Sequence, residues 1–372
     1  MSDTPLLSIV VPTKNRYKYL FCLIELIEGF KSEEIELVIQ DNSDDNSEIM
    51  RFCNKTVFTN LKYYHTEESI SVVSNSDKAV LHSTGEYVCV IGDDDGITSD
   101  IVNQVKIMKD KGYEAMLTRL AIYNWPDYVD NSCFRLSGTM TVDKMIGRNN
   151  TIDPKAELLK VCKNGFKDIG RLPKVYQAVV KRSTLDKIYD KCGTFFPGPS
   201  PDMANAIALS SLVDKVWYNE KPTIITGQCK SVGGGERLLD KLVPLTEVAH
   251  LPKDILSYWD NKLPVLWCSD TIWPGSAYIA AKRMNMNLVM DYNQIYGRFV
   301  FNHPQYKNAI SNFQYNILIV DYYRCKFLIQ KGIRWINNRL SYYISGKKRI
   351  HGQTLFRNLP TIQEASFVLS KL

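Results

Sequence analysis

The segment that decides the fold is Gly85-Glu-Tyr-Val-Cys-Val-Ile-Gly-Asp-Asp-Asp95, in which an apolar run of strand length ends directly in three aspartates. A short apolar run rich in β-branched residues and bounded by turn residues predicts a buried strand. Similar runs occupy residues 7–11 and 35–39, and apolar residues at helical spacing follow the first of them. Strands that alternate with helices predict an α/β fold, with a mostly parallel sheet flanked by helices.

Polar residues stand at the point where three of the predicted strands end. They are Thr13-Lys-Asn-Arg16, Asp41-Asn-Ser43 and Asp93-Asp-Asp95. Ligands of open parallel sheets bind beyond the carboxyl ends of the strands, so we expect these three clusters to converge. Adjacent carboxylates repel one another, and Mn²⁺ or Mg²⁺ can neutralise them while also binding substrate phosphates. A solvated acidic turn is the alternative for the three aspartates taken alone.

The remainder of the chain is less regular. Two further strands are expected at residues 113–120 and 175–180, with a loop-rich insertion at residues 123–150. A helix is expected at residues 203–212. The turn Pro197-Gly-Pro-Ser-Pro-Asp202 opens that helix, and the pattern becomes helical from about residue 240. We therefore expect a first domain over residues 1–240 and a C-terminal helical region over residues 241–372.

Composition excludes several classes of protein. Of the 372 residues, 45% are hydrophobic and 23% are charged, which is typical of a globular chain rather than a disordered or collagen-like one. The nine cysteines form no CxxC pair, which argues against a zinc ribbon or a disulfide scaffold. We find neither a signal-peptide pattern at the N-terminus nor an apolar run of the ~18 residues that a spanning helix needs. A cytoplasmic location is therefore expected.

Three motifs in register resemble the family 2 glycosyltransferases of the GT-A fold, including bacterial surface-polysaccharide enzymes. They are Ser8-Ile-Val-Val-Pro-Thr-Lys-Asn-Arg16, Leu37-Val-Ile-Gln-Asp-Asn-Ser43 and Gly85 to Asp95, and the resemblance covers residues 6–240. It implies inverting transfer of a sugar from a nucleotide diphosphate sugar, expected to be UDP-linked, to an acceptor hydroxyl. It also implies Mn²⁺ or Mg²⁺ as cofactor.

The resemblance also implies roles for individual residues. The positions that fall on nucleotide-sugar contacts are Pro12, Thr13, Asn15, Arg16, Asp41, Asn75, Asp93 and Asp94. Asp41 matches the acid that usually contacts the base, whereas Asn42, Ser43 and Ser76 depart from the residues that are common in the family. The metal would be held in the region of Asp93 to Asp95, and we assign it to Asp93 and Asp95, with Asp94 as the alternative to Asp95.

An inverting transferase needs a base that deprotonates the attacking hydroxyl. The family places an acid at the N-terminus of a later helix, and Asp202 matches that position, so we predict that Asp202 is the catalytic base. A helix-capping role is the alternative, and Asp168 and Asp186 are weaker candidates for the base. The glycine-rich residues 231–237 are read either as a lid, with Lys230 or Arg237 near the leaving group, or as a linker.

The excess of basic over acidic residues lies in the C-terminal region. Residues 322–363 contain nine Lys or Arg and no Asp or Glu, whereas the remainder has 37 basic and 40 acidic residues. The whole chain therefore has a net charge of +6. A basic stretch with interleaved Tyr, Ile and Trp is typical of an interfacial membrane helix, so we expect an anionic membrane surface rather than nucleic acid. A helical subdomain or an oligomer contact is the alternative. A chain that ends near residue 312 is expected to leave the membrane fraction.

These observations predict a metal-dependent inverting glycosyltransferase on the inner face of the cell membrane, acting on a glycan or lipid-linked acceptor. A nucleotidyltransferase is the first alternative, but it would be expected to carry a glycine-rich basic loop after the first strand. An inactive nucleotide-binding, membrane-associated scaffold is the second alternative, because Asn42 and Ser76 depart from the family pattern.

Overall fold

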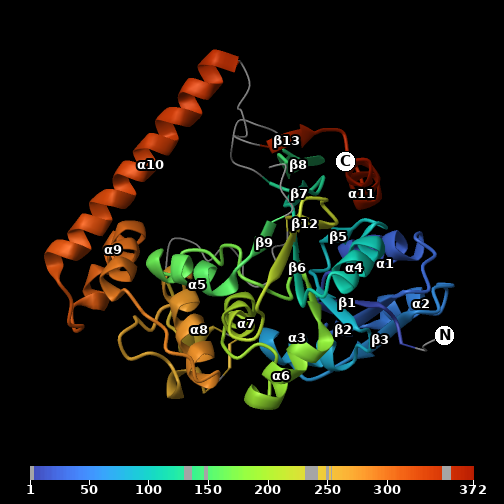
Figure 1. Ribbon diagram of the computed structural model, residues 1–372, viewed down its shortest axis with the longest axis horizontal. Helices are drawn as coiled ribbons and strands as arrows, with labels where there is room; N and C mark the ends of the chain where they lie inside the picture. Colours follow the sequence, from blue (N-terminus) through green and yellow to red (C-terminus); the bar gives the residue numbers. More distant parts are fainter. Residues whose placement is uncertain are drawn as a thin grey trace.

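The structure is a computed structural model that describes residues 4–129, 136–145, 150–230, 242–248, 251–252, 254–345 and 353–372. Its larger sheet contains β1 (Leu7–Thr13), β2 (Ile35–Asp41), β3 (Leu61–His65), β4 (Tyr87–Val90), β6 (Ala115–Thr118), β9 (Asn150–Ile152), β10 (Val179–Lys181) and β11 (Val216–Asn219). The strand order is β3-β2-β1-β4-β10-β6-β11-β9 (Figure 1). The first four strands pair in parallel, and β10 enters antiparallel between β4 and β6.

Helices cover both faces of this sheet, as the alternating pattern predicts. They are α1 (Tyr17–Glu28), α2 (Ser47–Cys53), α3 (Val72–Leu81), α4 (Ile101–Asp110), α6 (Arg182–Cys192) and α7 (Pro201–Ser210), whereas α5 (Pro154–Lys163) packs on α7. Successive residues of a strand point to opposite faces. Ile9 of β1 therefore packs in the core with α1 and α4, whereas Val10 packs in the core with α3, α6 and α7. The predicted α/β class is confirmed.

The region expected to be loop-rich contributes to a second, five-stranded sheet. Its strands are β5 (Gly96–Ile97), β7 (Ala121–Asn124), β8 (Thr139–Asp143), β12 (Ile224–Gln228) and β13 (Gln353–Phe356), in the order β13-β8-β7-β12-β5. Tyr123, Met140 and Val142 are fully or almost fully buried in the same core as α1. Each strand is two to five residues long, which is too short for an alternating pattern to stand out from a polar loop.

The last twenty residues return to the first domain rather than staying with the C-terminal helices. β13 pairs antiparallel with β8, and α11 (Ile362–Ser370) packs against α1 (Figure 1). The Tyr123 hydroxyl donates to the Leu359 carbonyl at 2.9 Å, and the Ser366 hydroxyl donates to the Ile97 carbonyl at 2.7 Å. Ile362 is completely buried. We therefore infer a different division, in which residues 353–372 belong to the domain expected over residues 1–240.

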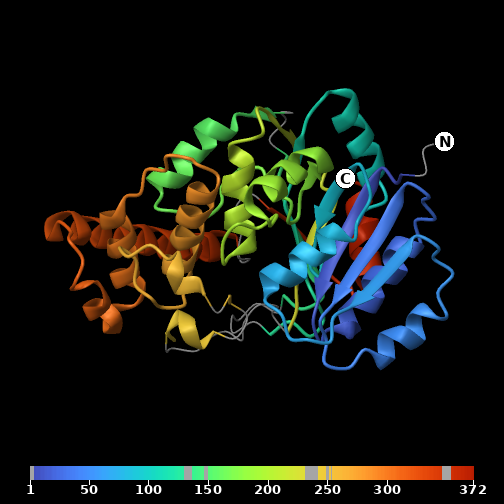
Figure 2. The same cartoon turned by 90° about the horizontal axis from the view of Figure 1, so that it is seen from below.

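The described residues between these parts form helices and short 3-10 turns. The helices are α8 (Ser269–Arg283), α9 (Tyr292–Asn302) and α10 (Ile317–Ser345), and the 3-10 turns are at Leu245–Glu247, Ile255–Ser257 and Pro304–Ile310. α8 packs on α7, and α10 crosses α9 closely at Gly297, where a Cβ atom would lie 2.8 Å from the Val320 carbonyl oxygen. Figures 1 and 2 show α10 extending well beyond α9. No helix in the described ranges combines the length and apolar character needed to cross a bilayer.

Candidate active site

The strand ends converge because the strands are in register. Val10 pairs with Val90 and Thr13 pairs with Asp41, so the ends of β1, β2 and β4 lie at the same edge of the sheet. The Thr13 hydroxyl donates to Oδ2 of Asp93 at 2.6 Å. The side-chain amide of Asn75, from the buried face of α3, donates to the Thr13 carbonyl at 3.2 Å. The expected convergence of polar residues is therefore present.

Arg16 connects the first of these clusters to the aspartates. Its guanidinium lies 2.8 Å from Oδ1 of Asp93 and 2.9 Å from Oδ2 of Asp94, and it stands over the Tyr19 ring at 5.5 Å from the ring centroid. The same guanidinium contacts the Cys229 sulfur at 2.9 Å. Burial disfavours the charged form of Arg16, but the carboxylates of Asp93 and Asp94 outweigh it and raise its pKa. Arg16 is thus the counter-ion of the acidic turn.

The three aspartates have different surroundings. Asp93 is buried, and burial raises its pKa to about 7 even though Arg16 opposes the shift. Asp95 is enclosed: its carboxylate accepts hydrogen bonds from the Gly92 and Gly227 amides, each at 2.8 Å, and from the Gln177 side chain at 3.0 Å. Burial and the neighbouring Asp94 raise the pKa of Asp95 to about 7. Asp93 and Asp94 therefore form ion pairs with Arg16, whereas Asp95 stabilises the turn through its hydrogen bonds to backbone amides.

Two elements that the motifs do not include hold this turn. Gln177 has a φ of 54°, in the left-handed region that side-chain-bearing residues seldom adopt, and its side chain binds Asp95. The Trp125 indole donates to the Asp94 carbonyl at 2.8 Å. β12 approaches so closely at Gly227 that a Cβ atom there would overlap the Asp94 carbonyl oxygen. The backbone of Asp94 is thus fixed from two sides.

Replacing Gly227 with Ala is expected to lower the melting temperature and reduce activity, because the new methyl group displaces the Asp94 backbone. Overpacking of this kind typically costs about 1–3 kcal/mol of folding free energy. Gly332→Ala in α10 is the matched control, since nothing lies within 4 Å of a Cβ atom at that position. Thermal unfolding of both variants measures the difference, and equal melting temperatures would contradict the close approach.

Asp41 lies beneath the surface at the end of β2. It is fully buried, and its Oδ2 accepts hydrogen bonds from the hydroxyls of Tyr17 at 2.6 Å and Tyr63 at 2.8 Å. The Ser43 hydroxyl accepts a hydrogen bond from the amide of Asn15, whose φ is 58°. A cleft of about 500 Å³ opens beside this loop, within the size range of small-ligand sites. Its lining residues are Asn15, Arg16, Tyr17, Lys18, Tyr19, Asp44, Asp45 and Glu48.

Asp202 lies in the first turn of α7, directly after Pro201, as the turn sequence predicts. Its carboxylate makes no hydrogen bond or ion pair among the described residues, and burial raises its pKa, with the nearby Lys174 opposing the shift. Tyr176 lies against the acidic turn, since a Cβ atom at Gly92 would be 3.1 Å from its hydroxyl. Burial and the carboxylates of Asp95 and Asp202 raise the pKa of Tyr176 well above the ordinary value, so both carboxylates are close enough to act on the same phenol.

Sequence reasoning missed Tyr19, Trp125, Tyr176, Gln177, Gly227 and Cys229. None belongs to a motif. Tyr19 lies in the first turn of α1, and the other five reach the site through strand pairing or a loop that no local pattern reveals. Residues 231–237, including Arg237, which we read as a lid or a linker, lie outside the described residues. Lys230 is described and exposed.

The carboxylate oxygens of Asp93 and Asp94 could bind the expected divalent cation. In this structure, however, the Arg16 guanidinium occupies the place beside them. Carboxylate oxygens are the ligands that Mn²⁺ and Mg²⁺ prefer. Oδ1 of Asp93 is buried and, apart from its ion pair with Arg16, accepts no hydrogen bond from a described residue. These two carboxylates therefore fit a cation once the guanidinium has moved away from them.

The polar side chains thus gather at the carboxyl edge of the sheet, which is where open α/β sheets bind their ligands. The chain belongs to glycosyl transferase family 2, whose model matches residues 8–196, about half of the chain. This match confirms the resemblance drawn from the three motifs. The matched range contains all three strand ends and stops before Asp202.

Solved structures with a similar arrangement include three of S. aureus TarS. TarS 1-349 in complex with UDP-GlcNAc has a TM-score of 0.49 at 16% identity, covering 81% of this chain and 73% of that one. TarS 1-349 in complex with UDP has a TM-score of 0.45 at 14% identity, covering 95% of this chain and 96% of that one. A further TarS structure has a TM-score of 0.42 at 18% identity, covering 60% of this chain and only 36% of that chain. Such values transfer no ligand to this chain. Comparison with curated protein sequences gave no significant match.

Proposed function

We propose that this chain transfers a sugar, with inversion, from a nucleotide diphosphate sugar carrying uridine to an acceptor hydroxyl. The observation that carries the proposal is the meeting of Thr13, Arg16, Asp93 and Asp94 at the carboxyl edge of the sheet, with Asp202 in the same neighbourhood. Membership of glycosyl transferase family 2 supports the sugar-transfer chemistry.

In this proposal the nucleoside lies in the cleft beside residues 15–19. Asp41 is buried under two tyrosines, so it acts by fixing Tyr17, which lines the cleft, rather than by touching the base. Asn75 supports the loop by donating to the Thr13 carbonyl, and Pro12 immediately precedes Thr13 in β1. Asp93 and Asp94 would hold Mn²⁺ or Mg²⁺, which supplies positive charge to the leaving diphosphate.

Asp202 is the base in the proposed reaction. Its carboxylate takes the proton of the acceptor hydroxyl as that oxygen bonds to the anomeric carbon, and the carbon–oxygen bond to the diphosphate breaks on the opposite face. The nucleoside diphosphate leaves with the bonding electron pair. Burial favours this role because a raised pKa brings the carboxyl closer to the operating pH.

The test is a panel of nucleotide sugars, with and without Mn²⁺, followed by thermal shift and by release of nucleoside diphosphate. Ligand binding raises the melting temperature by mass action. We expect a uridine diphosphate sugar to give the largest metal-dependent shift and slow metal-dependent hydrolysis. Release of pyrophosphate from a nucleoside triphosphate instead would refute the proposal in favour of a nucleotidyltransferase.

The acceptor is proposed to be a lipid-linked or surface-polysaccharide glycan, met at the inner face of the cell membrane. α10 supports this, because its side facing away from α9 is apolar and exposed, with relative exposures from 77% at Leu318 to 49% at Ile336. Tyr322, Ile329 and Ile333 lie on the same side at helical spacing. The other side packs on α9 through Val320 and Phe327. The helix also carries basic residues, of which Arg324 and Lys331 lie on the side of α9, and a basic residue near the membrane surface would attract anionic lipid at about 1 kcal/mol.

The double substitution of Ile329 and Ile336 by Glu is expected to abolish sedimentation with vesicles of phosphatidylcholine and phosphatidylglycerol. Truncation near residue 312 is not a clean test, because it also removes β13 and α11 from the first domain. Val57→Glu combined with Val289→Glu is the matched control, since both side chains are exposed elsewhere. Equal sedimentation of both variants and the wild type would contradict membrane contact through α10. A changed oligomeric state without vesicle binding would assign α10 to a contact between copies.

A further inference from the structure

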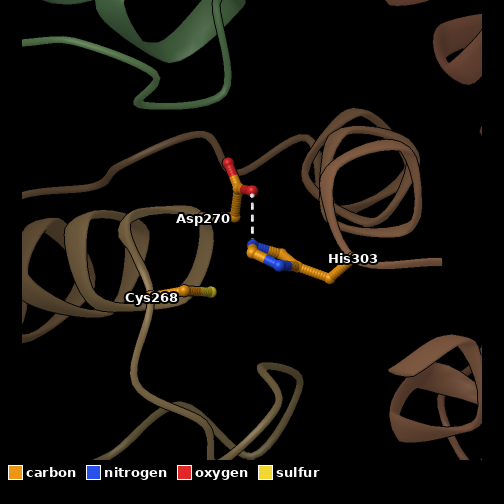
Figure 3. A group of neighbouring side chains, drawn as sticks. All are labelled: Cys268, Asp270 and His303. Atoms are coloured by element: carbon orange, nitrogen blue, oxygen red, sulfur yellow. Dashed lines mark ion pairs between the residues drawn. The ribbon is translucent and has the colours of Figure 1, made fainter. Parts of the chain in front are cut away.

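A second cluster of polar side chains lies among the C-terminal helices, where the start of α8 meets the end of α9. Cys268 immediately precedes α8, Asp270 lies in its first turn, and His303 immediately follows α9. One ligand atom from each residue lies within 4.8 Å of the others. Figure 3 shows the three side chains pointing toward a common centre, with the imidazole between the thiol and the carboxylate. Sulfur, nitrogen and oxygen atoms that could bind a metal thus converge at a place outside the proposed nucleotide-sugar site.

The separation of the nitrogen and oxygen donors is close to that of two ligands around a metal, and the sulfur lies within 4.8 Å of both. Nε2 of His303 lies 3.5 Å from Oδ2 of Asp270. A charge-assisted hydrogen bond between these groups would be shorter, at about 2.7–2.9 Å. Two ligands bound tetrahedrally at about 2.0–2.1 Å from a zinc ion lie about 3.3–3.4 Å apart. Entry of the ion therefore requires little movement of either side chain.

Neighbouring residues fix the carboxylate as they do in metal sites. Oδ1 of Asp270 accepts from the Arg298 guanidinium at 2.5 Å, and Oδ2 accepts from the Asn302 amide at 2.8 Å. Asp270 and Arg298 are both buried, so the carboxylate cannot turn away. Partners of this kind orient metal ligands and raise affinity. Cys268 and His303 are partly exposed, which leaves an approach for the ion and for a water ligand.

We propose that Cys268, Asp270 and His303 bind one Zn²⁺-class cation, with water as the fourth ligand. Cys268 binds as a thiolate after releasing its proton to solvent, and His303 binds as neutral imidazole. The thiolate and the carboxylate carry two negative charges against the three positive charges of the ion and Arg298, which leaves one positive charge at the site. Mixed sulfur, nitrogen and oxygen donors favour zinc or cobalt over the Mn²⁺ or Mg²⁺ expected at Asp93 and Asp94.

A cation at this place would join the two helices on which α10 depends. α8 packs on α7 of the first domain, and α9 carries α10. Linking the start of α8 to the end of α9 therefore fixes the direction in which α10 leaves the domain. The inference rests on geometry alone and holds whether or not the chain transfers sugars.

The test is titration of the chelator-treated full chain with Co²⁺, whose thiolate complexes absorb through sulfur-to-metal charge transfer. We expect one equivalent to bind with that absorption. Cys268→Ser should remove the absorption, and His303→Gln should weaken binding at least about tenfold, while Asn302→Ala should weaken it about 10–100-fold. Zn²⁺ should displace Co²⁺ and raise the melting temperature of the wild type more than that of Cys268→Ser.

Two cysteine controls make the assignment specific. Cys325→Ser alters an exposed thiol on α10, and Cys229→Ser alters the thiol beside Arg16 and Asp94. Both should retain the absorption. Its absence in the wild type, its persistence in Cys268→Ser, or its loss in Cys229→Ser would overturn the proposal. In the first case the cluster would be an ion-pair network that ties α8 to α9.

Discussion

Replacing Asp202 with Asn is expected to lower the rate of sugar transfer by about 10²–10⁴-fold, the usual contribution of a general base. The amide keeps the size of the side chain but cannot accept the acceptor proton. Binding of the nucleotide sugar should be unchanged, because the proposed donor contacts come from the strand ends and not from α7. Product formation and donor affinity are measured separately, by a transfer assay and by calorimetry.

The change should not unfold the protein. Burial raises the pKa of Asp202 in the folded state, so the carboxyl binds its proton more tightly when folded than when unfolded. Its contribution to stability is therefore present at low pH and is lost as the pH rises through the folded pKa. A neutral Asn avoids that loss, so the melting temperature at neutral pH should stay equal or rise. Retained turnover would remove Asp202 from the base role.

The same shift predicts the pH profile. The base must be ionised, so kcat/KM should fall as the pH drops through the raised pKa, at a higher pH than for an ordinary carboxyl group. Lys174 lowers the pKa of Asp202, and Lys174→Met should therefore move this acidic limb to still higher pH. Asp168→Asn and Asp186→Asn, which alter the weaker candidates for the base, should leave the limb in place.

Local patterns were sufficient to predict the βα units of the first hundred residues. Leu20, Leu23 and Ile24 recur at helical spacing and are fully buried in α1. The polar residues that end β1 and β4 meet because parallel strands in register end at one edge, a rule that needs no tertiary information. The prediction therefore succeeded where periodicity and strand direction determine the structure.

Contacts between distant segments could not be predicted in this way. Gly227 approaches Asp94 only because β12 joins the second sheet, and β13 reaches that sheet from more than 200 residues beyond β8. Nothing in a three-aspartate motif distinguishes its members, yet the hydrogen bonds from Gln177 and the Gly227 amide enclose Asp95. The assignment of Asp95 to the metal stays a prediction, and the geometry favours Asp94 in its place.

The last prediction concerns Arg16. Replacing it with Gln is expected to tighten Mn²⁺ binding at least tenfold in the absence of donor, because the guanidinium and the ion compete for Asp93 and Asp94. The guanidinium lies within 2.9 Å of both carboxylates, so an ion cannot bind them until these contacts break. Truncating one partner of a buried pair typically costs about 3–5 kcal/mol. The metal-free variant should therefore melt at a lower temperature than the wild type.

Added Mn²⁺ should restore the melting temperature of Arg16→Gln more than it raises that of the wild type, because the ion replaces the lost positive charge. Lys18→Gln is the matched control: Lys18 lies two residues further on, in the first turn of α1, is mostly exposed, and pairs with Asp127 instead of the acidic turn. Asp94→Asn should abolish the Mn²⁺ effect, whereas Asp95→Asn should destabilise the turn without a specific loss of metal affinity. If Arg16→Gln bound Mn²⁺ no better than the wild type, Arg16 would not compete with the metal, and the ion would have to bind elsewhere than between Asp93 and Asp94.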